Sequence, residues 1–299
     1  MNTARASRVV VIGDLLHDLL ARVEDVALGT DTFAPIHTAA GGSGANAAAW
    51  FARLGVEAHF TGRVGEDIFG TFLEGELERA GVTPHLAWDP SLATGKVFVL
   101  VGADGERTMI TDRGASENLS PEDLPKELFQ RDSHLHLSGY TFSEGSRRAT
   151  ALEALRLARE SAMTVSVDPS SVPLLEIIGP RRFLEWTVGA DLCFPNLEEG
   201  AFLAGSRDPD SILTKLCENY SAVVLKLGSE GAIYRGGDGE RIHLPAASAR
   251  AVDTTGAGDA LCAGFLAVWI SGFSGEAALK QGIQTAGQVV EHLGSRPEP

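Results

Sequence analysis

Short apolar, β-branched runs alternate with segments of helical period along most of this chain. The runs are 7–13, 57–64, 134–137, 164–167, 192–194 and 222–227, and the helical segments are 45–54, 68–80, 147–161, 197–204 and 212–220. A helix that connects two strands brings them side by side and parallel. The order therefore predicts an α/β fold with a central, mostly parallel sheet and helices on both faces.

Two stretches do not fit the alternation. Residues 14–40 show no helical period, and the runs 96–103 and 107–111 flank Asp104-Gly105, which is typical of a β-hairpin. We expect the parts at about 14–40 and 92–114 to form a small β-sheet lid on a single domain of residues 1–299. Residues 296–299 are expected to be loose.

Charge and composition narrow the function. The net charge is −15 and no cluster of lysine and arginine stands out, which disfavours nucleic acids and anionic membranes as partners. Cys193, Cys217 and Cys262 lie among apolar neighbours, as buried free thiols do in a reducing compartment. No apolar run is long enough for a signal peptide or a membrane span, so we expect a cytoplasmic protein.

The run Asp253–Asp259, DTTGAGD, directly precedes an apolar segment at 260–270 that has the character of a helix. Gly256, Ala257 and Gly258 would expose backbone N–H groups at the helix start, where the helix dipole also favours an anion. Asp259 would stand at the mouth of that site. The combination suits a reaction in which a hydroxyl group loses its proton while it attacks a phosphoryl group.

A second glycine-rich stretch, Gly41–Asn46, also precedes a helical segment. Glycines such as Gly42 allow a ligand to approach the backbone closely, and Asn46 offers both a donor and an acceptor. A tight loop with a buried asparagine is the alternative. The third glycine of the dinucleotide-binding fingerprint is missing because residue 47 is alanine, and the P-loop pattern does not occur.

Together, residues 41–55 and 253–265 closely resemble the two signature segments of the PfkB family, also called ribokinase-like sugar kinases. The segments 65–70, 77–82, 196–199 and 227–231 resemble further family motifs in the same order. The resemblance covers essentially the whole chain. It implies a ribokinase-like α/β fold with a small β lid, and an ATP-dependent kinase that phosphorylates a hydroxymethyl group of a sugar or sugar derivative.

The resemblance also implies roles for residues. Asp259 would be the catalytic base, and the N–H groups of Gly256, Ala257 and Gly258 would hold the transferring phosphoryl group. Gly42 and Asn46 would hold the acceptor. Asp18 falls where the family carries a sugar-binding carboxylate, and Asp14 is a second candidate for that role. Two adjacent hydroxyl groups can donate to one carboxylate.

On the nucleotide side, Asn196 and Glu199 would position Mg²⁺ and the triphosphate of ATP, largely through water. Gly228 and Gly231 would lie along the nucleotide, with Lys226 near its phosphates. No residue is expected to bind the metal directly. Asp253 and Thr255 match positions at which some members bind a monovalent cation such as K⁺.

Simpler readings compete with these roles. Asp14 would only cap a turn, Lys226 would be an ordinary lysine at a strand end, and Glu199 would be a solvated helix acid. His134 and His136 alternate along a strand without enough further donors for a metal, so we interpret them as structural.

The acceptor is less constrained. Ser43, Leu16 and the run Ser138–Tyr140 depart from strict ribokinases. Lys96, Arg107 and Arg113, on or next to the lid hairpin, suit an acidic or phosphorylated sugar, whereas Tyr140 and Phe142 would suit a nucleobase. A nucleoside kinase is therefore one alternative, and a sugar or nucleotide sensor without turnover is another. An open edge of the lid sheet would allow a homodimer.

Overall fold

The computed structural model describes residues 6–23, 25–102, 107–249, 252–292 and 294–297. Its large sheet runs in the order β13-β12-β11-β10-β9-β8-β1-β4-β5 within the described residues. The strands are β1 (Arg8–Ile12), β4 (Glu57–Gly65), β5 (Thr83–Asp89), β8 (Ser133–Ser138), β9 (Thr164–Asp168), β10 (Leu192–Cys193), β11 (Ala222–Lys226), β12 (Ala232–Gly236) and β13 (Arg241–Leu244). The seven from β11 to β5 are parallel, and β12 and β13 are antiparallel.

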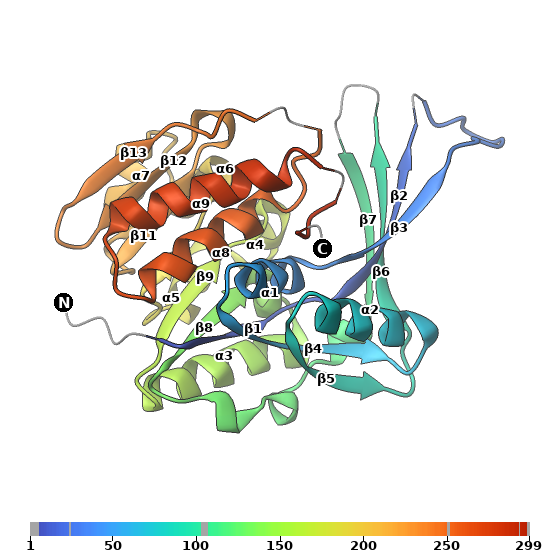
Figure 1. Cartoon of the computed structure of the whole chain (residues 1–299), viewed down its shortest axis with the longest axis horizontal. Coiled ribbons are helices and arrows are strands. Elements are labelled where there is room, and N and C mark those ends of the chain that lie inside the picture. Colours follow the sequence, from blue (N-terminus) through green and yellow to red (C-terminus); the bar gives the residue numbers. More distant parts are fainter. Residues whose placement is uncertain (1–5, 24, 103–106, 250–251, 293, 298–299) are drawn as a thin grey trace.

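Helices cover both faces of this sheet (Figure 1). One face packs against α1 (Ser43–Arg53), α2 (Ile68–Arg79), α8 (Ala257–Trp269) and α9 (Gly275–Val289). The other packs against α3 (Gly145–Glu160), α4 (Val172–Ile178), α5 (Pro180–Trp186), α6 (Leu197–Ala204) and α7 (Pro209–Leu216). In β1, Val9 and Val11 enter the first core, while Val10 and Ile12 enter the second. Successive side chains of a strand point to opposite faces, so an uninterrupted apolar run contributes side chains to the hydrophobic cores on both faces of the sheet.

A second, four-stranded sheet has the order β3-β2-β6-β7. Its strands are β2 (Leu16–Arg22), β3 (Ile36–Gly41), β6 (Thr94–Val101) and β7 (Arg107–Gly114), and it stands beside the large sheet in Figure 1. The predicted hairpin is present as the antiparallel pair β6 and β7, although its Asp104-Gly105 turn lies outside the described residues. By register, Asp18, Val97 and Arg113 share one face of this small sheet.

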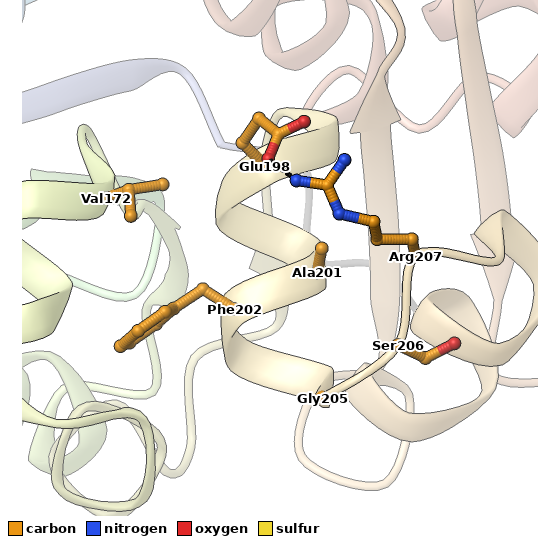
Figure 2. A pocket seen from close by; sticks show the side chains of 7 residues that line it. All are labelled: Val172, Glu198, Ala201, Phe202, Gly205, Ser206 and Arg207. Atoms are coloured by element: carbon orange, nitrogen blue, oxygen red, sulfur yellow. Dashed lines mark hydrogen bonds and ion pairs between the residues drawn. The ribbon is translucent and has the colours of Figure 1, made fainter.

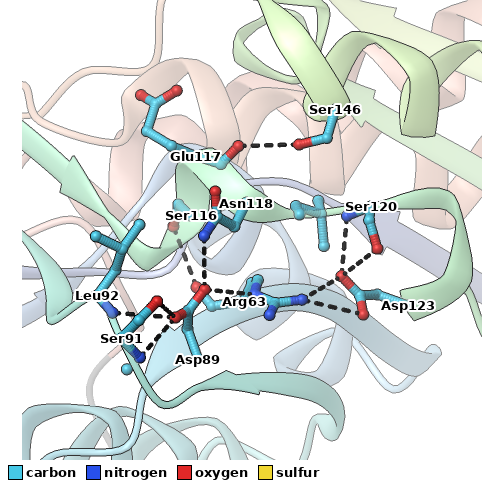
Figure 3. Close-up of polar contacts among 12 residues, drawn as sticks. Arg63, Asp89, Ser91, Leu92, Ser116, Glu117, Asn118, Ser120, Asp123 and Ser146 are labelled. Carbon is cyan, nitrogen blue, oxygen red and sulfur yellow. Dashed lines mark hydrogen bonds and ion pairs between the residues drawn. The ribbon is translucent and has the colours of Figure 1, made fainter.

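An ion-paired cluster joins the small sheet to the large one (Figure 3). Arg63 of β4 donates to Asp89 at the end of β5 and forms an ion pair with Asp123. Asp89 also accepts hydrogen bonds from the backbone and hydroxyl of Ser91 and from the side chain of Asn118. These hydrogen bonds, led by Ser91, hold the pKa of Asp89 well below its usual range. The cluster fixes the chain where it enters β6 and where it leaves β7.

Several elements were not predicted. The strands β5, β12 and β13 and the helices α4, α5 and α9 lie outside the predicted ranges. α7 begins at Pro209, three residues before the predicted start, because Asp208 caps it by accepting from the backbone N–H of Ser211 at 2.8 Å. Among the described residues, no helix is both long and apolar enough to cross a lipid bilayer.

Candidate active site

The two glycine-rich stretches meet at the starts of α1 and α8. Asp259, in the first turn of α8, accepts hydrogen bonds from Ser43 Oγ at 2.8 Å and from Asn46 Nδ2 at 3.1 Å. Burial raises the pKa of Asp259 to about 6, and the bonds from Ser43 and Asn46 oppose that rise. A carboxyl group with a pKa near 6 is mostly ionised at neutral pH and is still basic enough to accept a proton in a reaction.

The backbone at the start of α8 requires glycine. Gly256 caps the helix in the left-handed region at φ 76°, and a Cβ there would lie 2.5 Å from that of Ser295. A Cβ on Gly258 would lie 3.3 Å from Lys226 Nζ, so a cation stands beside the same turn. Of the three N–H groups predicted to bind an anion, that of Ala257 donates to Thr254 O at 3.3 Å.

Gly42 is required by packing on the segment that follows β1. Its φ is 97°, and a Cβ would lie 2.2 Å from the carbonyl oxygen of Asp14. Gly44 packs equally closely on Gly13, with its imagined Cβ 2.9 Å from Gly13 Cα. This close contact brings the predicted acceptor residues Asp14, Gly42 and Asn46 together at the carboxyl end of β1, where ligands bind in open α/β sheets.

Lys226 is not an ordinary strand-end lysine. Its Nζ lies 2.6 Å from Oδ2 of Asp168, the last residue of β9, and both side chains are almost fully buried. Burial alone would lower the pKa of Lys226, but Asp168 outweighs it and raises that pKa. Asp168 was missed in the sequence. The available signal was a carboxylate at the carboxyl end of a predicted parallel strand.

Asn196 and Glu199 form a capping box at the start of α6. Asn196 Oδ1 accepts from the Glu199 N–H at 2.9 Å, and Glu199 Oε2 accepts from the Asn196 N–H at 2.8 Å. Glu199 is buried, and burial raises its pKa to about 7. The interpretation of Glu199 as a solvated helix acid is therefore wrong. Asn196 also forms a β-bridge with Lys226, so the capping box lies directly beside the Lys226–Asp168 ion pair.

Asp14 is buried between two guanidinium groups, those of Arg113 from β7 and Arg147 from α3. Arg113 also stacks on Tyr140, with the guanidinium carbon 4.4 Å from the ring centre. Glu117 approaches both arginines at 3.9 and 3.6 Å from a half-exposed position. Arg147, which the sequence reading did not single out, is fully buried, and its Nε has no hydrogen-bond partner among the described residues.

Asp18 projects from β2 toward the start of α1. A Cβ on Gly41 would lie 2.1 Å from Asp18 Oδ2, so the glycine makes room for this carboxylate. Burial raises the pKa of Asp18 to about 7, and Arg296 opposes that rise.

The expectation that residues 296–299 are loose is wrong for Arg296. Its Nε donates to Asn46 Oδ1 at 3.3 Å and its Nη2 donates to Gly41 O at 3.2 Å. Hydrogen bonds of Gly294 to Asp253 and of Ser295 to Trp50 hold this segment in place. Residues 298–299 lie outside the described residues.

A cavity of about 430 Å³ lies beside the start of α8. The residues lining it are mostly small or apolar: Gly228, Ser229, Gly231, Ala246, Ala247, Ser248, Ala249, Thr254, Ala257, Leu261, Ile283, Ala286, Gly287 and Val290. Gly231 has φ 91°, and a Cβ there would lie 2.0 Å from Leu244 O. The cavity reaches Ala257, so an elongated ligand would extend from it to the turn at Gly256.

A hollow of about 360 Å³ on α6 shares no lining residue with this cavity (Figure 2). Glu198 points toward Arg207 and forms an ion pair of 2.7 Å with it at the surface. The neighbouring Glu199 is instead buried in the capping box. None of the predicted site residues lines the hollow.

The two strand histidines lie in the core. His134 bonds to Thr164 and Ser166, and His136 also bonds to Ser166. Burial lowers the pKa of His134 to about 3 and that of His136 to about 4, so both are neutral at physiological pH. In the part of the chain that the structure describes, no group of three or more His, Cys, Asp or Glu residues is arranged to hold a metal ion.

The fold and the two glycine-rich helix starts define a ribokinase-like α/β protein. The sequence matches the pfkB family carbohydrate kinase over residues 6–299. An ATP-dependent ribose-1-phosphate kinase from Halopiger xanaduensis is 32% identical over 98% of this chain and 95% of its own length. A fructokinase from Klebsiella pneumoniae is 34% identical over 87% of this chain and 83% of its own length.

Among solved structures, adenosine kinase from Sinorhizobium meliloti superposes with a TM-score of 0.89 and 28% identity, covering 97% of this chain and 96% of that one. The chain belongs to the pfkB family and is an ATP-dependent carbohydrate kinase. The resemblance and the fold predicted from the sequence are thereby confirmed. The names of these relatives cover a phosphorylated sugar, a free sugar and a nucleoside.

Proposed function

We propose that this protein transfers the terminal phosphoryl group of ATP to a hydroxymethyl group of a sugar, with Asp259 as the base. One observation carries the assignment: Asp259 lies at the start of α8 and is held there by Ser43 and Asn46 from the other glycine-rich segment. As the oxygen of the acceptor hydroxyl attacks the terminal phosphorus of ATP, the hydroxyl proton moves to the carboxylate of Asp259, the bond from that phosphorus to the bridging oxygen breaks, and ADP leaves. The N–H groups of Gly256 and Gly258 would stabilise the negative charge on the transferring phosphoryl group.

The nucleotide fits the cavity beside α8. Its small apolar lining suits a planar base, and its extension to Ala257 leads toward the helix start. Mg²⁺ would neutralise charge on the phosphates when bound. Asn196, Glu199 and Asp168 would provide oxygen atoms that bind water molecules around Mg²⁺, and Lys226 would lie near the phosphates. The buried Lys226–Asp168 pair supports this placement because the turn at Gly258 lies beside Lys226 Nζ.

Asp259→Asn tests the proposal. The amide keeps the size of the side chain but cannot accept a proton, so we expect turnover to fall by at least about a thousandfold while ATP still binds. Turnover would be measured by coupled ADP release with a panel of sugars, and ATP binding by calorimetry. Activity within a few-fold of wild type would remove Asp259 from the mechanism. A wild-type protein that binds ATP but phosphorylates no acceptor would favour the sensor.

An anionic sugar is a second candidate acceptor. Arg113 and Arg147 both bind Asp14, which is one of the predicted acceptor residues, and guanidinium groups recognise phosphate and carboxylate. The ribose-1-phosphate kinase relative acts on such a molecule. Comparing kcat/KM for ribose, ribose 1-phosphate, a sugar acid and adenosine would separate neutral, anionic and nucleoside acceptors.

We propose that the small sheet acts as a lid and as a dimer interface. Asp18 and Arg113 share the face with the buried Val97, while Ile36, Phe98 and Ile110 expose about half or more of their surface on the opposite face. An apolar face of this kind favours a second copy of the chain. Sedimentation of the wild-type protein and of the double variant Phe98→Asp/Ile110→Asp would test the dimer. A wild-type protein that sediments as a monomer would refute it.

Two predictions from the sequence stand apart from this mechanism. Asp253 Oδ1 accepts from the N–H and hydroxyl of Thr255, and Asp253 Oδ2 accepts from the Gly294 N–H. The predicted K⁺ dependence is checked by comparing turnover in potassium and in choline salts. The cytoplasmic location is checked by fractionating cells.

A further inference from the structure

The segment that follows α9 is anchored at three points before it reaches Arg296. The Gly294 N–H donates to Asp253 Oδ2 at 3.0 Å, and Trp50 Nε1 donates to Ser295 O at 3.0 Å. Ser295 is buried against Gly256, where a Cβ would be excluded. Figure 1 shows this segment turning back from α9 toward α1 and the small sheet. The position of Arg296 therefore follows from fixed backbone contacts.

Arg296 contacts the glycine-rich stretch Gly41–Asn46 of the predicted acceptor site. Two of its nitrogens bind Asn46 Oδ1 and Gly41 O. The amide of Asn46 in turn donates to Asp259, so Arg296 is one side chain removed from the proposed base. The hydrogen bond to Oδ1 also fixes which way the Asn46 amide faces.

Two polar atoms at this place are buried without a partner among the described residues. They are Nη1 of Arg296, a donor, and Oδ1 of Asp18, an acceptor. The two side chains are close enough that each shifts the pKa of the other, yet no ion pair within 4 Å joins them. Both side chains lie at Gly41: Arg296 Nη2 donates to its carbonyl oxygen, and the carboxylate of Asp18 occupies the space of its missing Cβ. Buried polar atoms are almost always hydrogen-bonded in native proteins, so an unpaired donor and an unpaired acceptor beside the same glycine point to a ligand.

We propose that Arg296 and Asp18 together bind two hydroxyl groups of the acceptor sugar, with Arg296 Nη1 donating to one oxygen and Asp18 Oδ1 accepting from the other. This inference rests on the proposed function and adds a specificity-determining residue to it. A hydroxyl pair fits better than an anion at this position. Burial lowers the pKa of Arg296 to about 10, and the carboxylates of Glu76 and Asp18 oppose that shift, so an anionic ligand would meet two negative charges.

The test compares Arg296→Gln and Arg296→Lys with wild type. We expect the glutamine variant to raise the KM of the acceptor at least tenfold and to leave the KM of ATP unchanged. The fall in kcat should be smaller than the rise in KM, because Asn46 keeps its own hydrogen bond to Asp259. The lysine variant keeps the charge but loses the planar fork, so it should recover only part of the loss. Arg181→Gln, at an exposed arginine of α5, is the matched control and should change nothing.

Acceptor analogues that lack one hydroxyl distinguish direct contact from a structural effect. Wild type should lose about tenfold in kcat/KM for the analogue that lacks the contacted hydroxyl, whereas Arg296→Gln should show almost no further loss. Asp18→Asn should become insensitive to a different, neighbouring hydroxyl. Thermal unfolding of each variant would show that the fold is intact.

Three results would overturn the proposal: an unchanged KM in Arg296→Gln, a fall in kcat alone, or equal sensitivity of wild type and variant to every missing hydroxyl. If Arg296→Gln does not fold, the acceptor analogues are tested on wild type and Asp18→Asn instead. A wild type that tolerates the loss of every single hydroxyl group of the acceptor would then refute the proposal. Failure of wild type to phosphorylate any sugar would instead refute the proposed function.

Discussion

Asn46 donates a hydrogen bond of 3.1 Å to Asp259 across 213 positions of the chain. Asn46 lies in α1, at the end of the glycine-rich stretch Gly41–Asn46, and Asp259 lies in α8, at the end of the run Asp253–Asp259. The bond therefore ties the proposed acceptor residues to the proposed base. Ser43 reinforces it with a second bond to the other carboxylate oxygen.

Asn46→Ala should lower kcat by about ten- to a hundredfold, because the base loses one of the two groups that orient it. Hydrogen bonds from Ser43 and Asn46 also hold down the pKa of Asp259, so the acid limb of the pH–rate profile should move to higher pH in the variant. Steady-state kinetics between pH 5 and about 9 would check both effects. A profile that moves to lower pH would contradict the arrangement.

Turnover should depend on pH through Asp259. The base works only when ionised, and its pKa is about 6, so kcat should be constant above that pH and fall about tenfold per unit below it. The neighbouring charge on Asp168 raises the pKa of this carboxyl group, and that on Lys226 lowers it. Measurement at saturating acceptor separates this limb from any titration of Asp18 in binding. A flat profile down to pH 5 would exclude the assignment.

Asp18→Asn should stabilise the protein at high pH. The pKa of Asp18 is about 7 in the folded state and about 4 when unfolded, so the folded state binds the proton more tightly and its stability falls as pH rises between these values. Above pH 7 the amide removes a buried charge, and we expect the free energy of unfolding to rise by about 1–3 kcal/mol. Urea denaturation at pH 8 and at pH 4 checks this, with little difference at the lower pH.

Lys226→Met should be strongly destabilising. It leaves Asp168 buried without the partner that lies 2.6 Å away, and loss of one member of a buried pair costs about 3–5 kcal/mol. The double variant Lys226→Met/Asp168→Asn should recover much of that loss, although not turnover. Chemical denaturation of both single variants and the double variant measures the coupling. Additive effects would show that the two side chains do not interact.

Ala247→Phe should fill the cavity beside α8 and weaken ATP binding by at least about tenfold, with little effect on the stability of the sheet. Ala201→Phe is the matched control, because Ala201 lines the separate hollow on α6 in Figure 2. Calorimetric titration with ATP compares the two. Equal weakening in both variants would show that the cavity does not hold the nucleotide.

The sequence anticipated the elements whose signals are local. The alternation of strands and helices reports burial on two faces of one sheet, and β1 shows it in four consecutive residues. Gly42 and Gly256 have positive φ angles that other residues adopt only under strain. Glycine at these two positions therefore allowed the turns to be predicted from the sequence. The Asn196 and Glu199 pair, which the resemblance had singled out, is also local, since a capping box joins residues three positions apart.

The short helices α4 and α5 were missed because seven residues are too few to show the 3.6-residue periodicity of apolar side chains that predicts a helix. Strands β12 and β13 were missed because they follow the turn at Gly231 in an antiparallel meander, outside the alternation.

By itself the sequence determined the class of fold, the two glycine-rich helix starts and the carboxylate of Asp259 that follows one of them, because the signal of each lies within a few positions. Only the tertiary structure decided that Asp168 pairs with Lys226, that Asp14 lies between two arginines, and that Arg296 returns to the acceptor site. These contacts join residues 58 to 250 positions apart. Chain separation leaves no periodic trace of such contacts, and a charged residue has the same local pattern whether it ends in solvent or in a buried site.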